Sequence, residues 1–562
     1  MTHSNIVLVD MQTIELIQLL DKATGRIGPE AARVDTSNLW RKAFKARDQE
    51  LLGEEADICL RVAIEAIESI ALKRASRFTP AQWLWILRRI PLAYFQGAHV
   101  ASSNNRRHLA ELLSAKGGAL GDAMTPGSGG APISLSSSSA MAILEFVRSA
   151  VLLARLHAMF KMCGKGAALT ISQNGAPSLQ VPEDVQTKIA RYQSRHQYWG
   201  PMMSGRAGTQ LLDFGEEIQE DSLIGAVRLP TPRSITLEAE NSPLPSLTEG
   251  KYSLQAHWQP AALSLSRLAQ VSKKRSPDWW QPEFPYIALL MKLALRISMQ
   301  GDTGGWWPTL LRTGYVTGDA STFARSFDLS ISADSSYMDD IFGAKGHRFS
   351  AAEGIEILSN MGNSWPATLG PPIRFSAESV YIDLESCLFN LDSYSLFGPD
   401  GGPEANERGT HFERAIQSLI DSSTWVPPPD ILRIRGRTLR IGGVALTDID
   451  AIGTNGSRLL LVDAKSYPFS EEYQRGSYRA VHGLENKVRE NVKAWESKVE
   501  KIRSSPVGDN FDFSRYDELI GIVVTPFSPY LADGDFPSAA PGIPALCSLA
   551  ELERWLLSED SR

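Results

Sequence analysis

The sequence is poor in cysteine and carries no excess of positive charge. Its four cysteines, Cys59, Cys163, Cys387 and Cys547, lie far apart and include no Cys-x-x-Cys pair. A zinc site built from thiolates is therefore excluded, and we expect buried thiols in a reducing compartment, which indicates a cytoplasmic protein. The 57 basic and 64 acidic residues give a formal net charge of −7, so a nucleic-acid partner would have to be bound by a local patch.

Long uncharged apolar runs and the basic start of a signal peptide are also missing. The N-terminus has no basic segment and carries acidic residues within its apolar stretch. The best candidate for a membrane span, residues 140–160, is interrupted by Glu145, Arg148 and Arg155, which share one side of a helix. This spacing favours an amphipathic core helix, so we expect no membrane partner.

The length and composition predict several folded domains. A chain of 562 residues with 43% hydrophobic and 22% charged residues is too long for one core and too apolar for general disorder. Apolar spacing predicts a mostly α-helical N-terminal region followed by a C-terminal α/β domain. We divide the chain into a helical domain at 1–115, a Gly/Ser-rich linker or loop at 116–139, a mainly helical domain with irregular or short-strand segments at 140–397, and the C-terminal domain at 398–562.

Glycine and proline mark the irregular parts of the N-terminal region. Residues 116–139 contain no Gly-Lys-Ser/Thr ending and follow no clear strand, so a linker or loop is favoured over a phosphate-binding loop. Prolines interrupt residues 228–255, which predicts short strands there. Residues 283–300 instead have the apolar spacing of a helix.

The C-terminal domain has a readable order of elements. Apolar alternation, turn residues and helical spacing together predict the order α-β-β-β-α-β-α. The predicted elements are a helix at 409–421, strands at 431–441, 443–452 and 457–464, a helix at 482–503, a strand at 518–525 and a helix at 548–557.

One hairpin of this domain concentrates charged residues at a single place. Asp448 and Asp450 share one face of the strand "ALTDIDAIG", and an Asn-Gly pair at 455 and 456 predicts a tight turn. The returning strand, "RLLLVDAKSY", is apolar until Asp463, and Lys465 follows on the same face. The register therefore lets Asp450 lie beside Asp463 and Lys465.

Neighbouring carboxylates and an amine indicate a metal-assisted reaction. Two carboxylates close together raise the pKa of one of them, and a divalent cation removes that cost. Mg²⁺ prefers hard oxygen ligands and takes one or two carboxylates with waters and a phosphate. A lysine beside the metal can orient the attacking water and stabilise the charged transition state. Asp450, Asp463 and Lys465 therefore predict phosphodiester hydrolysis.

Asp450, the sequence Asp463-Ala464-Lys465 and Glu413 in the preceding helix together resemble the PD-(D/E)xK, or restriction-endonuclease-like, nuclease superfamily. The resemblance covers only the C-terminal domain and implies a mixed sheet flanked by helices. It implies Asp450, Asp463, the carbonyl of Ala464 and Glu413 as metal ligands and Lys465 as the catalytic lysine. The three carboxylates then also serve catalysis, and the implied cofactor is Mg²⁺ or Mn²⁺.

The motif departs from the family's pattern at two positions. Ile449 stands where the family name has proline, and Asp463 stands where glutamate is commoner. Asp448 also competes with Asp450 as a ligand, because both lie on one strand face, although the spacing favours Asp450.

Basic residues near the motif are candidates for binding nucleic acid. Arg433, Arg435 and Arg437 alternate along the first predicted strand, where they could hold phosphates or simply protect a sheet edge. Lys487 and Asn491 could contact substrate from the following helix or belong to a solvated face.

The sequence thus predicts a metal-dependent endonuclease that acts on DNA in preference to RNA. The N-terminal region would supply target selection, control, or contacts with a protein partner or a second copy. The resemblance also implies a role in bacterial defence against phage. The alternatives are a repair or recombination nuclease, an RNA-cleaving enzyme, an inactive nucleic-acid-binding scaffold, and a helical partner-binding protein with an accessory C-terminal domain.

Overall fold

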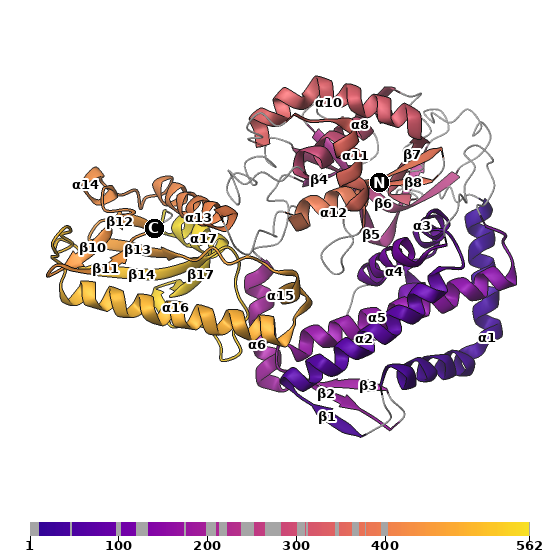
Figure 1. Cartoon of the computed structure of the whole chain (residues 1–562), viewed down its shortest axis with the longest axis horizontal. Coiled ribbons are helices and arrows are strands. Elements are labelled where there is room, and N and C mark those ends of the chain that lie inside the picture. The colour runs from indigo at the N-terminus through magenta and orange to yellow at the C-terminus, as the bar shows by residue number, and fades with distance from the viewer. Residues whose placement is uncertain are drawn as a thin grey trace.

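The structure is a computed structural model that mixes helices and sheets. Its buried apolar residues form separate cores in a helical bundle, a central unit and a C-terminal unit (Figure 1). Part of the predicted linker or loop, residues 120–132, lies outside the described residues. The structure describes residues 11–44, 48–96, 103–119, 133–173, 176–197, 209–212, 222–237, 252–264, 283–300, 310, 313–342, 348–361, 370–376, 378–394 and 403–560.

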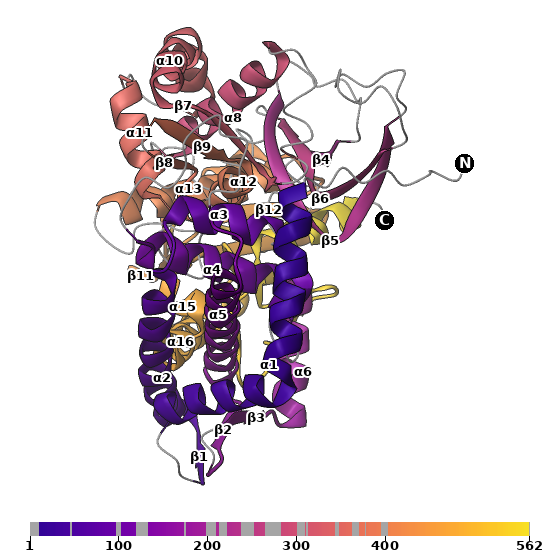
Figure 2. The same cartoon turned by 90° about the vertical axis from the view of Figure 1, so that its right-hand side faces the viewer.

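The helical bundle is built around α1, which kinks at Gly28, and the two long helices α2 and α5 (Figure 2). The buried residues of α2 recur every three or four positions, as one helical face requires: Ala56, Leu60, Ala63, Ile67 and Ala71. α3 starts at a capping box in which Thr79 and Gln82 satisfy each other's backbone N–H groups. The elements are α1 (Met11–Ala43), β1 (Gln49–Leu51), α2 (Gly53–Ala75), α3 (Pro80–Arg89), the 3-10 helix η1 (Leu92–Phe95), α4 (Ser103–Gly117), α5 (Ser137–Cys163), β2 (Ala168–Ile171), β3 (Pro177–Gln180) and α6 (Glu183–Gln197).

The central unit contains two three-stranded antiparallel sheets covered by helices. Their strand orders are β4-β6-β5 and β7-β9-β8. The helix predicted at 283–300 is confirmed as α8 (Glu283–Gln300). The elements are β4 (Thr209–Leu211), β5 (Ser222–Leu237), β6 (Tyr252–Ser264), α8, β7 (Tyr315–Asp319), α10 (Ala320–Phe342), α11 (Ala351–Asn360), β8 (Ile373–Ser376), β9 (Ser379–Asp383) and α12 (Leu384–Tyr394).

The prediction of short strands over 228–255 is wrong in length. β5 has 16 residues and β6 has 13, and they form one long antiparallel pair. The pairing shifts its register between Arg228 and Arg233, which brackets Pro230 and Pro232. The prolines therefore fall at a bulge, where a missing backbone N–H does not end a strand.

The C-terminal unit is a three-layer arrangement around a four-stranded sheet of order β12-β13-β14-β17. β13 is antiparallel to β12 and parallel to β14, and β14 is parallel to β17. Helix α16 covers one face, and α13 and α17 cover the other (Figure 1). The main elements are α13 (Pro403–Asp421), α14 (Pro429–Leu432), β10 (Thr438–Ile441), β11 (Val444–Asp448), β12 (Ala451–Asn455), β13 (Arg458–Ala464), α15 (Glu471–Arg475), α16 (Tyr478–Ser504), β14 (Glu518–Thr525), β15 (Ser538–Ala540), β16 (Ile543–Pro544), β17 (Leu546–Ser548) and α17 (Leu549–Asp560).

Most predicted elements of this unit are present, with two corrections. The strand predicted at 431–441 is wrong in its first half, because Pro429 at the first position and Asp430 in the first turn start the short helix α14. The strand predicted at 443–452 is two strands. It breaks at Ile449 and Asp450, so that β11 pairs with β10 in a separate two-stranded sheet and β12 joins the main sheet.

All four cysteines lie in the described part of the chain and are free. Cys163, Cys387 and Cys547 are buried as expected, whereas Cys59 is only half-buried. Across the helices of the described ranges, none is long and apolar enough to cross a membrane.

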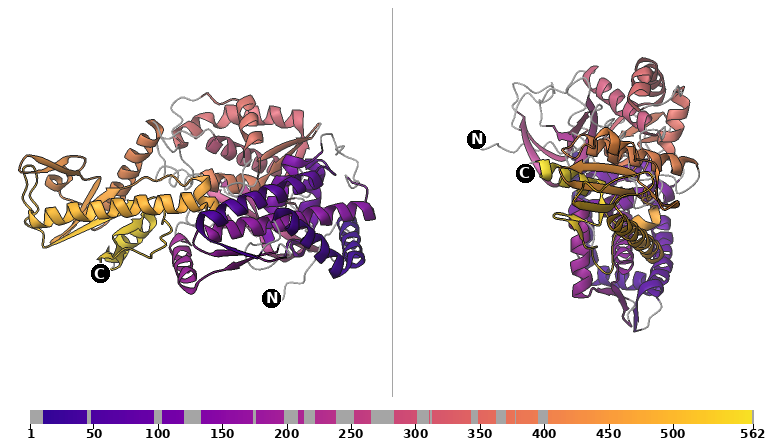
Figure 3. Two further views of the ribbon diagram at one scale, coloured as in Figure 1. Left: turned by 60° about the horizontal axis from the view of Figure 1, so that its bottom comes forward. Right: turned by 90° about the vertical axis from the view of Figure 1, so that its left-hand side faces the viewer.

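The bundle holds the segment that joins β13 to α16, which is close to the predicted site. Arg61 of α2 pairs with Asp57 and with Glu472 of α15, both at 2.7 Å. The backbones of Gly164 and Gly476 meet so closely that a Cβ on Gly164 would overlap the carbonyl of Gly476. The C-terminal unit therefore extends from the bundle at a tightly packed contact (Figure 3).

Helix α6 belongs to the core of the C-terminal unit although it precedes that unit by about 200 residues in sequence. Ile189 of α6 is buried in the core beneath α16. Arg195 pairs with Glu551 of α17 at 2.7 Å and with Asp535 at 2.8 Å. Two different parts of the N-terminal region thus fix the C-terminal unit in place.

Candidate active site

Asp450 and Asp463 meet where the β12–β13 hairpin opens. Ala451 pairs with Val462, and the N–H of Asp450 donates to the carbonyl of Val462 at 3.2 Å. One carboxylate oxygen of Asp450 accepts the backbone N–H of Ala464 at 2.7 Å. The break in the strand after Asp448 therefore lets Asp450 turn toward the end of β13.

The charged residues Asp463 and Lys465 follow a fully buried run of β13. Residues 459–462 alternate between the cores on the two faces of the sheet, as a central strand requires. Asp463 follows and is only 7% exposed. The Lys465 ammonium lies 2.8 Å from one oxygen of Asp463, and its backbone N–H donates to Val524 of β14 at 2.9 Å. Asp463 and Lys465 thus form an ion pair at the edge of the core.

Burial and like charge disfavour the ionised form of Asp450. Burial raises the pKa of Asp450, the charges of Asp463 and Glu413 raise it further, and the net value is about 6. The Ala464 N–H and Lys465 oppose this change without cancelling it. Burial also raises the pKa of Glu413, against the opposing charges of nearby cations. A divalent cation bound here would favour the ionised form of these carboxyl groups.

Glu413 is positioned by a glutamine one turn later on α13. The buried side-chain amide of Gln417 donates to the carbonyl of Ile452 and accepts its N–H, both at 2.9 Å. β12 is an edge strand of the sheet, so Gln417 replaces part of a missing neighbouring strand. This pair of bonds fixes α13 against β12 and holds Glu413 within electrostatic range of Asp463 and Lys465.

The available donors fit a hard divalent cation. Across the described residues, no group of three or more His, Cys, Asp or Glu side chains is close enough to hold a metal ion. Three oxygen donors nevertheless lie at this end of the hairpin: Asp450 just before β12, and Asp463 and the carbonyl of Ala464 at the end of β13. Mg²⁺ commonly binds one or two carboxylates and completes its shell with water and a substrate phosphate. Occupancy would require Asp463 to share its carboxylate between the cation and Lys465.

The chain was compared with family models, curated proteins and solved structures, and no match was found in any of the three comparisons.

The three predicted arginines do not share a strand face, which corrects the expectation for them. Arg433 ends the short helix α14, and Arg433 and Arg437 are both exposed. Arg435 is half-buried and donates from Nε to the carbonyl of Asp450 at 3.2 Å. The helical turn therefore brings Arg435 to the site and leaves the other two on the surface.

Lys487 and Asn491 of α16 lie beside the site. Both contact Tyr467, a residue that the sequence did not lead us to predict. Asn491 donates its side-chain N–H to the hydroxyl of Tyr467, and the Lys487 ammonium lies 5.5 Å from the centre of the Tyr467 ring. Burial raises the pKa of Tyr467, and the charge of Asp463 adds to this effect. Tyr467 follows Asp463 and Lys465 with the same spacing of two, which was the signal available in the sequence.

Asp448 is separated from the cluster by the break in the strand. It ends β11, where it pairs with Thr438 in the two-stranded sheet, and its side chain is exposed. Asp450 instead starts the approach to β13 and is half-buried. The geometry therefore supports Asp450 over Asp448 as the carboxylate that accompanies Asp463.

Proposed function

We propose that this protein is a metal-dependent endonuclease that hydrolyses phosphodiester bonds. The observation that carries the proposal is the arrangement of Asp450, Asp463 and Lys465 at the open end of one hairpin. Burial raises the pKa of Asp450 to about 6, and its carboxylate accepts the N–H of Ala464, so the group is held in place and a cation would favour its ionised form. A carboxylate pair beside a lysine is the donor set that cation-assisted phosphate chemistry uses.

Each side chain has a separate task in this reaction. Asp450, Asp463 and the carbonyl of Ala464 would hold Mg²⁺ or Mn²⁺. When bound, the cation polarises the scissile phosphate and makes its water a better nucleophile. Lys465, released from Asp463, orients the attacking water and stabilises negative charge on the phosphate. Glu413 adds a further carboxylate that can accept a proton near the site.

The topology of the C-terminal unit supports the same proposal. A helix with Glu413 precedes a mixed sheet, and the long helix α16 follows the strand with Asp463 and Lys465. This order is the one that the resemblance to the PD-(D/E)xK superfamily implies. The proposed substrate is DNA and the proposed role is defence against phage, and both rest on that resemblance.

The test is cleavage of plasmid DNA, linear DNA and RNA by the full chain with Mg²⁺, Mn²⁺ or EDTA. Lys465→Ala and Asp463→Ala should lower the metal-dependent rate by about 100-fold or more. Asp448→Ala is the matched control, because that carboxylate is exposed on the neighbouring strand. If both variants cleave at the wild-type rate, neither Lys465 nor Asp463 takes part in the reaction.

A second candidate function is a nucleic-acid-binding scaffold without catalysis. The observation in its favour is the ion pair between Lys465 and Asp463, which occupies both groups. Binding measurements on labelled DNA and RNA separate the two functions. A scaffold binds without cleaving under all metal conditions, and Asp463→Ala leaves its affinity unchanged.

A further inference from the structure

Helix α1 bends at Gly28, and its two halves run in different directions around the bundle (Figure 2). Gly28 has φ 66° and ψ 161°, a backbone conformation that residues with a Cβ rarely adopt. Pro29 follows in the sequence, and the residue before a proline is disfavoured in a helical conformation. The glycine and the proline together therefore fix the bend.

A cavity lies on the inner side of this bend. Its walls are both halves of α1, the short helix η1 with the residue that follows it, and one face of α5. The volume of this α1 cavity is about 510 Å³, and small-molecule sites in proteins typically measure about 300–1,000 Å³. The α1 cavity is therefore large enough to hold a small organic ligand.

The wall of the α1 cavity is mostly apolar, because its hydroxyl groups are already used. The hydroxyls of Thr24 and Thr36 donate to backbone carbonyls one turn earlier on α1, at 2.8 and 2.9 Å. The hydroxyl of Tyr94 donates to Asp21. None of these three hydroxyl protons is left for a ligand, so the wall favours an apolar group.

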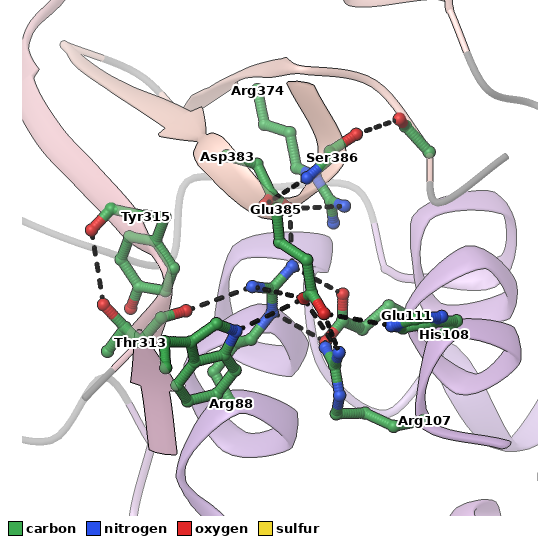
Figure 4. Close-up of polar contacts among 12 residues, drawn as sticks. Arg88, Arg107, His108, Glu111, Thr313, Tyr315, Arg374, Asp383, Glu385 and Ser386 are labelled. Carbon is green, nitrogen blue, oxygen red and sulfur yellow. Dashed lines mark hydrogen bonds and ion pairs between the residues drawn. The ribbon is translucent and has the colours of Figure 1, made fainter. Parts of the chain in front are cut away.

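One wall of the α1 cavity, η1, is held by buried charged groups of the bundle. Arg88 of α3 contacts Glu111 of α4 at 2.7 Å and Asp383 of β9 at 2.6 Å, and these side chains are fully buried (Figure 4). η1 lies between α3 and α4 in the sequence, and Arg106 of α4 donates to the carbonyl of Phe95 in η1 at 2.8 Å. This wall is therefore formed before a ligand binds, which lowers the entropic cost of binding.

Arg148 of α5 supplies the polar end of the α1 cavity. Among the described residues that line the cavity, it is the only charged one. It donates to Asp35 at 2.8 Å, and its other N–H groups make no hydrogen bond with described residues. The side chain is 21% exposed, and its unbonded nitrogens are not sealed from solvent. A ligand can therefore reach these donors.

Asp35 does not balance the charge of Arg148 by itself, because a second arginine shares it. The other oxygen of Asp35 accepts from Arg74 of α2 at 3.2 Å, so two guanidiniums stand against one carboxylate, 2 − 1 = +1. Glu145, three residues before Arg148 on α5, is exposed and makes no ion pair with described residues. The edge of an apolar cavity thus carries one surplus positive charge.

We propose that the α1 cavity binds a free fatty acid, with its apolar chain against α1 and α5 and its carboxylate on Arg148. The planar guanidinium matches the two oxygens of a carboxylate. A single negative charge balances the surplus, whereas an uncharged ligand would cover Arg148 and leave this charge without a partner. A phosphate monoester would bring close to two negative charges and overcompensate. This inference does not depend on the proposed nuclease function.

The test is calorimetric titration of the full chain with sodium octanoate at fixed ionic strength. Decanoate, which has two more methylene groups, should bind about 10-fold more tightly than octanoate, because it removes more apolar surface from water. Acetate is the head group without the chain, and 1-octanol is the chain without the charge. Both should bind at least 10-fold more weakly than octanoate.

Two substitutions locate the ligand, and each has a matched control on α1. Arg148→Gln should weaken octanoate binding about 10-fold and leave the weaker binding of 1-octanol unchanged, which a general loss of structure would not do. Ala32→Phe places a ring in the α1 cavity and should abolish the binding of both. Arg33→Gln and Ala31→Phe change exposed neighbours outside the cavity and should bind octanoate like the wild type.

Three calorimetric results overturn the proposal: no octanoate binding by the wild type, equal affinity for octanoate and 1-octanol, or full octanoate affinity in Arg148→Gln. Sedimentation velocity tests a different occupant of the α1 cavity. A wild-type dimer that Ala32→Phe disrupts and Ala31→Phe preserves would assign the cavity to a second copy of the chain, and would overturn the fatty-acid assignment as well.

Discussion

Replacing Asp450 with asparagine should stabilise the C-terminal unit at neutral and alkaline pH when no divalent cation is present. Burial and the neighbouring carboxylates raise the pKa of Asp450 from an ordinary value of 3.8 to about 6. A difference of about two pH units corresponds to about 3 kcal/mol, since each unit is worth about 1.4 kcal/mol. Because Asp450 is only half-buried, solvent screening reduces the expected gain to about 1–2 kcal/mol.

The sign of the pH dependence follows from the raised pKa. Above pH 6 the native state must ionise Asp450 at a cost that the unfolded chain does not carry. As the pH falls from 6 to 4, Asp450 becomes protonated in the native state and this cost disappears. Asparagine is neutral throughout and its side-chain oxygen can still accept the N–H of Ala464. The advantage of Asp450→Asn should therefore be full at pH 8 and absent below pH 4.

Hydrogen exchange of the peptides that cover residues 451–464, measured in EDTA, reports the local free energy of opening. Asp448→Asn is the control, because an exposed carboxylate should change this free energy by less than about 0.5 kcal/mol. Added Mg²⁺ should protect the wild type and leave Asp450→Asn unchanged. A variant that is less stable than the wild type at pH 8, or whose advantage persists at pH 4, refutes this account of the site.

Three further substitutions test the parts that position the site. Gln417→Leu should destabilise the C-terminal unit by about 2 kcal/mol in urea unfolding, because two buried backbone groups of β12 lose their partners. Gly164→Ala should loosen the packing against Gly476 and speed limited proteolysis between α15 and α16. Tyr467→Phe should lower the free energy of unfolding by about 1 kcal/mol, because Asn491 loses its acceptor, and the misplaced Asn491 should lower kcat/KM for DNA cleavage by about 5-fold.

Matched controls separate these effects from general damage. Gly409→Ala adds a methyl group on α13 with nothing within 4 Å, so proteolysis should match the wild type. Asn491→Ala should slow cleavage as much as Tyr467→Phe if the hydrogen bond between them matters. Equal stability of Gln417→Leu and the wild type would show that α13 is held by its apolar face alone.

The hairpin was predictable because its determinants are local. The apolar run of β13, the Asn-Gly turn and the strand period fix which residues face each other, and β13 and β14 lie close to their predicted bounds. The proximity of Asp450 to Asp463 follows from that register. In contrast, the arginines after Pro429 were misplaced because proline at the first position of a short helix outweighed an alternating pattern.

Contacts between distant segments could not be read from the sequence. Gln417 makes hydrogen bonds to the backbone of Ile452, and no side-chain pattern in the sequence predicts this contact. Arg88 and Asp383 are separated by 295 residues, and their pairing depends on how two units pack. Apolar periodicity reports which face of an element is buried, but it does not report which polar groups meet there.

Helix α6 determines where this protein can be divided. A fragment that begins at Pro403 contains every strand of the four-stranded sheet, yet it lacks the buried Ile189 and the Arg195 that pairs with Glu551. Such a fragment would expose an apolar surface to water and leave a largely buried carboxylate without its cation. The smallest unit that folds with a complete core is therefore discontinuous in sequence, and α6 supplied as a separate peptide should restore its solubility.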